Sequence, residues 1–299
     1  MDMLQITELT KRFGEKEVLK GLDLSVPAQS IFGFIGKNGA GKTTTMKTVL
    51  GLSKADSGEI YVAGEKVVYG QTATNRYIGY LPDVPEFYSF MNPAEYLAFC
   101  GEITGLDKKE SRRRSSELLE LVGLGGEKHR IKGFSRGMKQ RLGIAQALLN
   151  KPKLLICDEP TSALDPVGRK EILDILLAVR EQTTVLFSTH ILSDVERICT
   201  DIAFLNDGVV SIQGKLADIK TQYRSEEYQL ETETEADKLT LLQAFPKLRS
   251  LGRNQLRFFD KDYDIFEVLH FITERQIVLL KLERVEPTLE SLFMEVILK

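Results

Sequence analysis

The sequence predicts an α/β fold, with a layered domain over residues 1–219 and a smaller α+β domain over residues 220–299. Three observations lead to this prediction. Short β-rich runs alternate with helical stretches from Met3 to about Lys220, which is typical of a sheet layered with helices. Between about residues 93 and 150 helices dominate, so we expect an inserted helical subdomain there. After Lys220 the strands and helices follow a different order, which indicates a separate domain.

The composition is that of an ordinary globular chain. Its 299 residues are 42% hydrophobic and 28% charged, which excludes a disordered or collagen-like protein. The 40 basic and 43 acidic residues leave a formal charge of −3, so the basic excess typical of nucleic-acid-binding proteins is missing. The three cysteines, Cys100, Cys157 and Cys199, are too widely spaced for a metal knuckle and fit a reducing compartment. We see no signal peptide or membrane-spanning run and expect a cytoplasmic chain.

The first buried strand leads into a glycine-rich loop. Residues 31–36 are apolar and too few for a helix, so they predict a strand buried on both faces. Residues 36–43, Gly-Lys-Asn-Gly-Ala-Gly-Lys-Thr, fit the phosphate-loop pattern and precede a helical stretch. The glycines let backbone N–H groups approach a phosphate, which the helix N-terminus also attracts. Lys42 is expected to reach the β- and γ-phosphates, and the Thr43 hydroxyl to bind Mg²⁺. The alternative is a glycine-rich turn that matches by chance.

A second apolar strand, residues 154–157, ends in two carboxylates, Asp158 and Glu159. Charged groups at the end of a buried strand are costly unless they have a function. Asp158 could hold Mg²⁺, directly or through water. Glu159, on the opposite side of the strand, could polarise an attacking water. Such a pair alone is more often a capping turn, but the phosphate loop upstream favours a site.

Three further motifs fit a nucleotide site. Residues 134–141, Phe-Ser-Arg-Gly-Met-Lys-Gln-Arg, precede an Ala/Leu-rich helix, with Ser135 as its predicted N-cap. Residues 162–165, Ser-Ala-Leu-Asp, closely follow the two carboxylates. Residues 186–190, Leu-Phe-Ser-Thr-His, place His190 at the end of a strand. A lone histidine there is usually structural, but beside these motifs we interpret it as a phosphate sensor.

In this order the five motifs resemble the nucleotide-binding subunits of ABC transporters, over about residues 3–215. The resemblance implies a P-loop NTPase core that binds ATP with Mg²⁺ and hydrolyses it. It implies that Glu159 is the catalytic glutamate and His190 the switch histidine, with Lys42 stabilising charge on the phosphates. The implied Mg²⁺ ligands are Thr43, Asp83 and Asp158. The implied nucleotide-binding residues are Phe13, Gly36, Asn38, Gly39, Ala40, Gly41, Lys42, Thr43 and Thr44, together with Ser135 and Gly137.

Some of these residues carry a further qualification. Phe13 matches the aromatic residue that stacks on adenine in the family, and the alternative is an ordinary half-buried strand aromatic. Ser135 and Gly137 would face the γ-phosphate of the opposite subunit, since the nucleotide sits between two subunits in this family. Residues 162–165 resemble the D-loop.

The sequence departs from the family pattern at two motifs. The signature Leu-Ser-Gly-Gly-Gln is replaced by Phe-Ser-Arg-Gly-Met, which keeps Ser135 and Gly137 but introduces Arg136 and Met138. This form resembles the branch that serves ABC-2 type exporters. The Q-loop glutamine is replaced by Asp83. A carboxylate can hold Mg²⁺ or its water, but it cannot donate a hydrogen bond as an amide does.

The tail predicts a small domain and a final helix. Its order, β-α-β-β-α-β, is the ferredoxin-like order. The final helix spans residues 287–298 and carries an apolar stripe of Leu289, Leu292, Phe293 and Val296, able to fasten it to the ATPase core or to a second subunit. A packing and dimer-stabilising role is favoured over binding of a regulatory ligand. Residues 286–293 also resemble an ending common among ABC-2 type ATPases, including drug and antibiotic exporters.

The sequence therefore indicates an ATPase subunit that powers a separate membrane-spanning permease, as a homodimer or heterodimer held at the cytoplasmic face of the cell membrane. One alternative is a soluble ABC ATPase acting on DNA or ribosomes; only one cassette is present, and no heptads lie between Thr43 and Ser135. Another is a regulatory module without hydrolysis, against which Glu159 and His190 argue. The basic run at residues 108–114 is either a solvated helix face, which we favour, or a lipid-headgroup patch.

Overall fold

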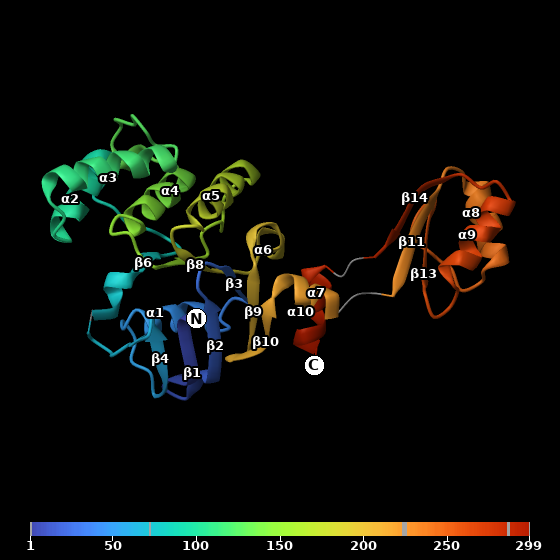
Figure 1. Ribbon diagram of the computed structural model, residues 1–299, viewed down its shortest axis with the longest axis horizontal. Helices are drawn as coiled ribbons and strands as arrows, with labels where there is room; N and C mark the ends of the chain where they lie inside the picture. The colour runs from blue at the N-terminus through green and yellow to red at the C-terminus, as the bar shows by residue number, and fades with distance from the viewer. Residues whose placement is uncertain (1, 72, 223–225, 286–287, 299) are drawn as a thin grey trace. The chain divides into compact units, whose positions relative to one another are not determined.

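The computed structural model describes residues 2–71, 73–222, 226–285 and 288–298. It divides into two compact units, one of residues 1–217 with 293–299 and the other of residues 218–292. Figure 1 shows the elements of each unit. The division places residues 293–299 in the first unit, whereas the sequence assigns them to the second domain. None of the helices in these described ranges is long and apolar enough to cross a membrane.

A six-stranded sheet forms the centre of the first unit, in the order β10-β9-β3-β8-β7-β6. Its strands are β3 (Ile31–Gly36), β6 (Ile78–Leu81), β7 (Leu154–Asp158), β8 (Thr184–Thr189), β9 (Asp201–Asn206) and β10 (Val209–Lys215). All neighbours pair in parallel except β9 and β10. Strands β3, β7 and β8 are buried along their whole length, as the apolar runs predict. Parallel pairing brings the carboxyl ends of these three strands to one edge of the sheet.

A second sheet of the first unit is antiparallel, in the order β2-β1-β4-β5. Its strands are β1 (Asp2–Phe13), β2 (Lys16–Pro27), β4 (Ser57–Val62) and β5 (Glu65–Lys66). One apolar core joins both sheets and helix α1 (Lys42–Val49); Leu22 and Phe34 represent the sheets in it and Met46 the helix. This core fixes the loop before α1 against the strand edge.

Helices α2 (Pro93–Ile103), α3 (Lys108–Leu121) and α4 (Arg136–Ala147) follow one another between β6 and β7 and group together in Figure 1. Polar side chains begin each of them. Asn92 and Glu95 form a capping box on α2, Asp107 caps α3, and Ser135 caps α4 as predicted. The other elements of the first unit are η1 (Ala73–Tyr77), η2 (Ile131–Gly133), α5 (Pro166–Val179) and α6 (Leu192–Ile198).

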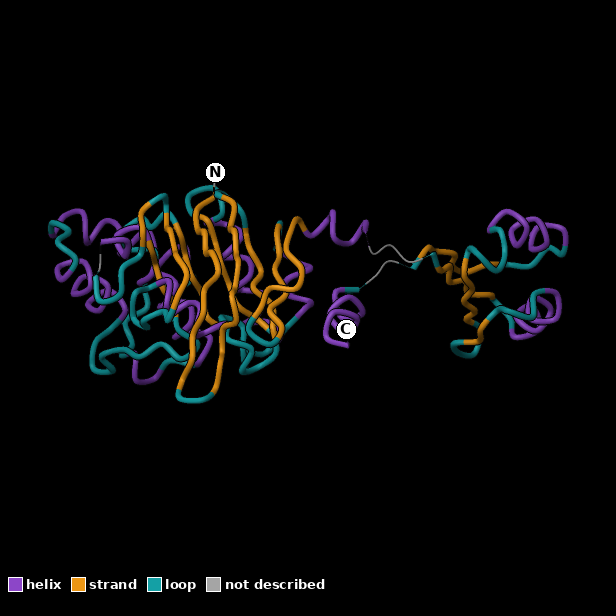
Figure 2. Tube along the Cα trace, turned by 90° about the horizontal axis from the view of Figure 1, so that it is seen from below, coloured by secondary structure: helices purple, strands orange, loops and turns teal. Residues whose placement is uncertain are grey.

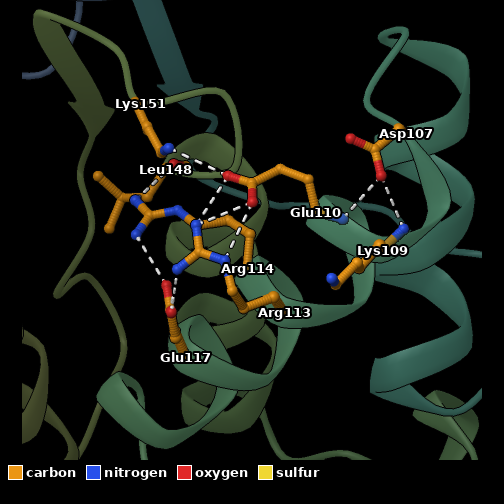
Figure 3. Close-up of polar contacts among 8 residues, drawn as sticks. All are labelled: Asp107, Lys109, Glu110, Arg113, Arg114, Glu117, Leu148 and Lys151. Carbon is orange, nitrogen blue, oxygen red and sulfur yellow. Dashed lines mark hydrogen bonds and ion pairs between the residues drawn. The ribbon is translucent and has the colours of Figure 1, made fainter.

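Two arginines of the basic run at the start of α3 are paired with carboxylates (Figure 3). Arg113 binds Glu110 on one side and Glu117 on the other. Arg114 lies 3.7 Å from Glu117, and Lys151 lies 3.1 Å from Glu110. Arg113 and Arg114, two of the five cations of the run, are compensated in this way, as expected for the favoured alternative of a solvated helix face.

The second unit consists of one sheet with helices on one side (Figures 1 and 2). Its elements are β11 (Glu227–Thr232), α8 (Glu235–Ala244), β12 (Arg249–Ser250), β13 (Gln255–Phe259), α9 (Ile265–Glu274) and β14 (Leu279–Arg284). They occur in the predicted order. The strands pair antiparallel in the order β12-β13-β11-β14. Leu230 and Phe258 of the sheet share a buried core with Leu241 of α8 and Val268 of α9.

The boundary between the units runs through α7 (Leu216–Gln222) and α10 (Leu289–Leu298). Leu289 and Leu292 of the predicted apolar stripe are buried. The ring of Phe293 packs on Phe204 of β9 in the same unit, with 5.5 Å between centroids. The predicted helix start at residue 287 and the side chain of Val296 lie outside the described residues.

Candidate nucleotide site

The glycine-rich loop and the strand ends form a cavity of about 580 Å³. The predicted residues that line it are Phe13, Asn38, Gly39, Gly41, Lys42, Thr43, Thr44, Asp83, Asp158, Glu159 and His190. Gly36 and Ala40 do not line it. Ala40 shapes the loop instead, donating its N–H to the Lys37 carbonyl oxygen at 3.1 Å.

The loop requires glycine at two positions for different reasons. Gly41, the N-cap of α1, has φ of 114°, and a Cβ there would lie 2.8 Å from Leu19 Cδ2. A Cβ on Gly36 would lie 2.8 Å from the Leu205 carbonyl oxygen. No side chain caps α1, so its first N–H groups are left for an anion in the cavity.

Lys42 is a buried cation, 6% exposed, held by the loop itself. Its Nζ donates to the Gly36 carbonyl oxygen at 2.6 Å and to the Lys37 carbonyl oxygen at 3.3 Å. It also lies 3.1 Å from Glu159 Oε1. The ammonium group is therefore oriented toward the cavity by three oxygens, which is the arrangement needed to meet phosphate charge.

Asp158 ends β7 with both carboxylate oxygens bonded. Thr43 Oγ1 donates to Oδ2 at 2.7 Å, and Ser188 Oγ donates to Oδ1 at 2.6 Å. Only 3% of Asp158 is exposed, so these bonds compensate a buried charge. Hydroxyl and carboxylate oxygens are the donors that Mg²⁺ prefers, and the pair Thr43 and Asp158 therefore fits the predicted metal ligands.

Glu159 lies between two cationic or protonatable groups. Its Oε1 faces Lys42, and its Oε2 is 2.9 Å from His190 Nδ1. Its backbone has φ of 48°, an uncommon and unfavourable value for a residue with a side chain. The Glu159 N–H donates to Ser188 Oγ and to the Ser188 carbonyl oxygen, each at 3.1 Å, which stabilises this conformation.

Phe13 ends β1 and is 55% exposed at the rim of the cavity. Lys11 Nζ lies 5.0 Å from its ring centroid. An exposed ring of this kind is available for stacking, which fits the predicted adenine contact better than the half-buried alternative.

Asp83 lines the cavity, but its hydrogen bonds are made with side chains of helix α4. Its Oδ1 accepts from Arg136 Nη2 at 3.0 Å, and its carbonyl oxygen accepts from Gln140 Nε2 at 2.6 Å. Both residues belong to α4, so the Q-loop position and the signature helix are joined directly. The two departures from the family pattern, Asp83 and Arg136, are thus partners of each other.

Ser135 and Gly137 do not reach the nucleotide cavity. They line a separate cavity of about 320 Å³ together with Arg136, Leu164 and Asp165. The Ser135 hydroxyl accepts the Met138 N–H at 3.2 Å as the helix cap. Within one chain the signature and the phosphate loop are therefore two distinct surfaces.

The cysteines take no part in the site. All three are free thiols. Burial raises the pKa of the Cys157 thiol far above its usual range, and the neighbouring Asp158 charge adds to the effect. A thiol that stays protonated is a poor nucleophile, so the chemistry of the cavity falls to its carboxylates.

Comparison with known proteins identifies the family. The family described as ABC transporter matches residues 19–162. Over 229 residues, 76% of each chain, the protein is 44% identical to the uncharacterized ABC transporter ATP-binding protein YxlF of Bacillus subtilis (strain 168). The chain belongs to the ABC transporter ATP-binding proteins.

Two further relatives of this ATP-binding subunit are informative. The bacitracin transport ATP-binding protein BcrA of Bacillus licheniformis is 42% identical over 209 residues, which cover 69% of this chain and 67% of BcrA. The ATP-binding cassette MJ0796, solved as a dimer with ADP and Pi, is 26% identical with a TM-score of 0.64, covering 72% of this chain and 99% of that one. The subunit is an ATPase of an ABC transporter, and an ABC ATPase outside transport is not favoured.

Sequence reasoning missed some residues of the ATPase cavity. Lys16, Val18, Lys37 and Ser162 also line it. From β8, Ser188 donates to the Asp158 carboxylate and accepts the backbone N–H of Glu159. Lys37 lies inside the glycine-rich loop and Ser162 inside the Ser-Ala-Leu-Asp motif, so these motifs could have indicated both residues. Lys16 and Val18 come from β2, and no local pattern there indicates a ligand.

Proposed function

We propose that this subunit powers export through a separate membrane-spanning permease chain, as an ABC-2 type ATPase held at the cytoplasmic face of the membrane. The bacitracin relative supports the transport of a drug-like compound, and the ending at residues 286–293 supports the exporter branch. The finer architecture belongs to the same proposal. Helices α2 to α4 form an inserted helical subdomain at about residues 93–150, and the strand order β12-β13-β11-β14 supports a ferredoxin-like domain within residues 220–299.

One observation carries the proposed mechanism: Glu159 is held between Lys42 and His190 in the cavity that contains Thr43 and Asp158. We propose that Glu159 orients the attacking water and takes up its proton. Lys42 and His190 stabilise the charge that develops on the transferred phosphoryl group. Mg²⁺, when bound, would neutralise phosphate charge, and the residues that would hold it are Thr43 and Asp158, with Asp83 as a second carboxylate.

The nucleotide contacts follow from the same geometry. The proposed ATP site places adenine on Phe13 and the phosphates on residues 36–44. Ser135 and Gly137, which line a different cavity, would contact the nucleotide of a second ATPase subunit. This arrangement fits either a homodimer or a heterodimer.

An exposed apolar patch beside α2 is the proposed contact with the permease. Val84, Tyr88 and Phe90 are 63%, 52% and 63% exposed, and Tyr88 is braced by Phe99 of α2 at 5.4 Å between ring centroids. Exposed apolar groups gathered in one place commonly mark an interaction surface. The patch begins next to Asp83, so a permease seated there would lie against the Q-loop position.

Co-purification tests the proposed function. Tagged protein extracted in mild detergent should bring with it a polytopic membrane protein, identified by mass spectrometry. The double variant Tyr88→Ser/Phe90→Ser should lose that protein, whereas Phe266→Ser, which changes an even more exposed ring on α9, should retain it. Recovery of no polytopic protein, or equal loss in the Phe266 variant, would contradict the proposal.

A further inference from the structure

Two ion pairs join α5 to α6, and they differ in exposure. Arg169 Nη2 lies 2.6 Å from Asp194 Oδ1, and the two side chains are 28% and 5% exposed. Farther along both helices, Arg197 Nη2 lies 3.0 Å from Asp174 Oδ1, and these side chains are 42% and 49% exposed. An exposed pair contributes little, whereas removing one partner of a buried pair leaves an uncompensated charge. The buried Arg169–Asp194 pair is therefore the candidate for a functional role, and the exposed Arg197–Asp174 pair serves as the comparison.

Arg169 holds the start of α6. This helix has only seven residues, begins at Leu192, and has no side-chain cap at Ile191. A helix this short is not stable by itself. Arg169 binds its first turn twice, at Asp194 and at Ser193 Oγ, the latter at 3.3 Å. The other carboxylate oxygen of Asp194 is buried without a hydrogen-bond partner among the described residues, so Arg169 supplies the charge compensation.

The Arg169–Asp194 ion pair, called the bridge below, joins two helices that begin near the two cavities of the first unit. Arg169 lies in the first turn of α5, where its backbone N–H donates to the carbonyl oxygen of the N-cap, Asp165, at 2.9 Å; Asp165 also lines the signature cavity. On the other side, Asp194 lies in the first turn of α6, which begins two residues after His190, and His190 lines the nucleotide cavity and contacts Glu159. The Arg169 side chain therefore joins the helix that begins after the D-loop to the helix that begins after His190.

We propose that Arg169 is a positioning residue for ATP hydrolysis. Acting from α5 through Asp194 and the first turn of α6, it keeps His190 on Glu159. The proposal rests on the proposed roles of His190 and Glu159. The competing explanation is a purely structural clamp between α5 and α6, which would lower stability without acting on His190.

The first test compares Arg169→Met with Arg197→Met, since methionine keeps an apolar stem and removes the guanidinium. Arg169→Met should lower kcat by about 10- to 100-fold, the scale expected when a catalytic group is misplaced. Its KM for ATP should stay within about twofold, because adenine and phosphate contacts are untouched. Arg197→Met should stay within about twofold of the unmodified protein in both constants. Equal loss in the two variants, or no loss in Arg169→Met, would overturn the proposal.

A neutral variant guards against a folding failure. Arg169→Met/Asp194→Asn removes both charges and so leaves no unpaired buried ion. It should unfold at a temperature close to that of the unmodified protein and still lose kcat. In a His190→Ala background, adding Arg169→Met should change kcat by less than about twofold, because both changes act through the same contact. A full, multiplicative loss in that background would mean that Arg169 acts elsewhere.

Nuclear magnetic resonance separates this proposal from the proposed function. The chain has three histidines, so the imidazole signal of His190 is assignable from the spectrum of His190→Ala. Arg169→Met should shift that signal at fixed pH and Arg197→Met should not, whether or not the protein hydrolyses ATP. Absence of ATPase activity would defeat the proposed function alone, whereas an unchanged His190 signal in Arg169→Met would defeat the bridge.

Discussion

The two cavities of the first unit are organised in opposite ways. In the nucleotide cavity Lys42 and Asp158 are buried, and loop carbonyls and two hydroxyls hold them in place before any nucleotide arrives. In the signature cavity Ser135 is exposed, and the nearby Asp83–Arg136 pair is 48% and 41% exposed. The difference indicates that the nucleotide cavity is preorganised by its own chain, whereas the signature cavity is left exposed, as the proposed contact with a second subunit requires.

Loss of the loop cation should produce a large effect at the preorganised cavity. Lys42→Ala should weaken ATP binding by about 10- to 100-fold, because a hydrogen bond to a charged group is lost. Lys47 lies in the same helix but does not line the cavity, so the variant Lys47→Ala should bind ATP normally. Equilibrium binding of a fluorescent ATP analogue measures both. Unchanged affinity in Lys42→Ala would show that the loop does not bind phosphate.

The buried hydroxyl of Ser188 allows the preorganisation of the nucleotide cavity to be tested through the stability of the fold. Ser188 is fully buried and donates to Asp158, so Ser188→Ala leaves a carboxylate oxygen without its donor. We expect the free energy of unfolding to fall by about 1–3 kcal/mol. Ser211→Ala, at an exposed position of β10, should change it by less than about 0.5 kcal/mol. Urea unfolding of the two variants measures both changes. Equal changes in the free energy of unfolding would mean that the hydrogen bond from Ser188 to Asp158 does not stabilise the fold.

Loss of the exposed Asp83–Arg136 pair should change the Mg²⁺ requirement of the ATPase more than the free energy of unfolding. If Asp83 contributes to Mg²⁺ binding, Asp83→Ala should raise the Mg²⁺ concentration for half-maximal ATPase activity. Arg136→Gln removes the competing cation and should leave that concentration equal or lower. Loss of this exposed pair should change the free energy of unfolding by no more than about 1 kcal/mol. Superimposable Mg²⁺ titrations of Asp83→Ala and the unmodified protein would assign Asp83 to the loop alone.

The smallest effect concerns the tail. Removing residues 220–299 should reduce dimer formation in a Glu159→Gln background with ATP, while the nucleotide cavity remains intact. The matched change Phe293→Ala removes only the ring that packs on Phe204 and so tests the final helix alone. Sedimentation velocity measures the dimer population. Equal populations with and without the tail would favour a regulatory role for it.

Much of the fold and site was predictable because their signals are local. The phosphate loop and the carboxylate pair at Asp158 are contiguous motifs after buried strands, and the order of elements in the second unit follows from hydrophobic periodicity. Ser135 was predictable as a helix cap for the same reason.

The remainder depends on contacts between distant segments. The bond from Ser188 to Asp158, the pairing of Asp83 with Arg136, and the lining of the cavity by Lys16 arise only when separate elements meet. The placement of residues 293–299 in the first unit likewise depends on Phe293 meeting Phe204. No periodicity or motif in the sequence reports such pairings.

The central claim, that Glu159 is the catalytic carboxylate of a preorganised ATP site, is tested most directly by turnover and binding in Glu159→Gln. Glutamine keeps the size of the side chain but cannot accept the proton of water. Turnover should fall by about 10²-fold or more, the scale of a lost general base, while ATP affinity remains near that of the unmodified protein. Near-normal turnover in Glu159→Gln would contradict the account.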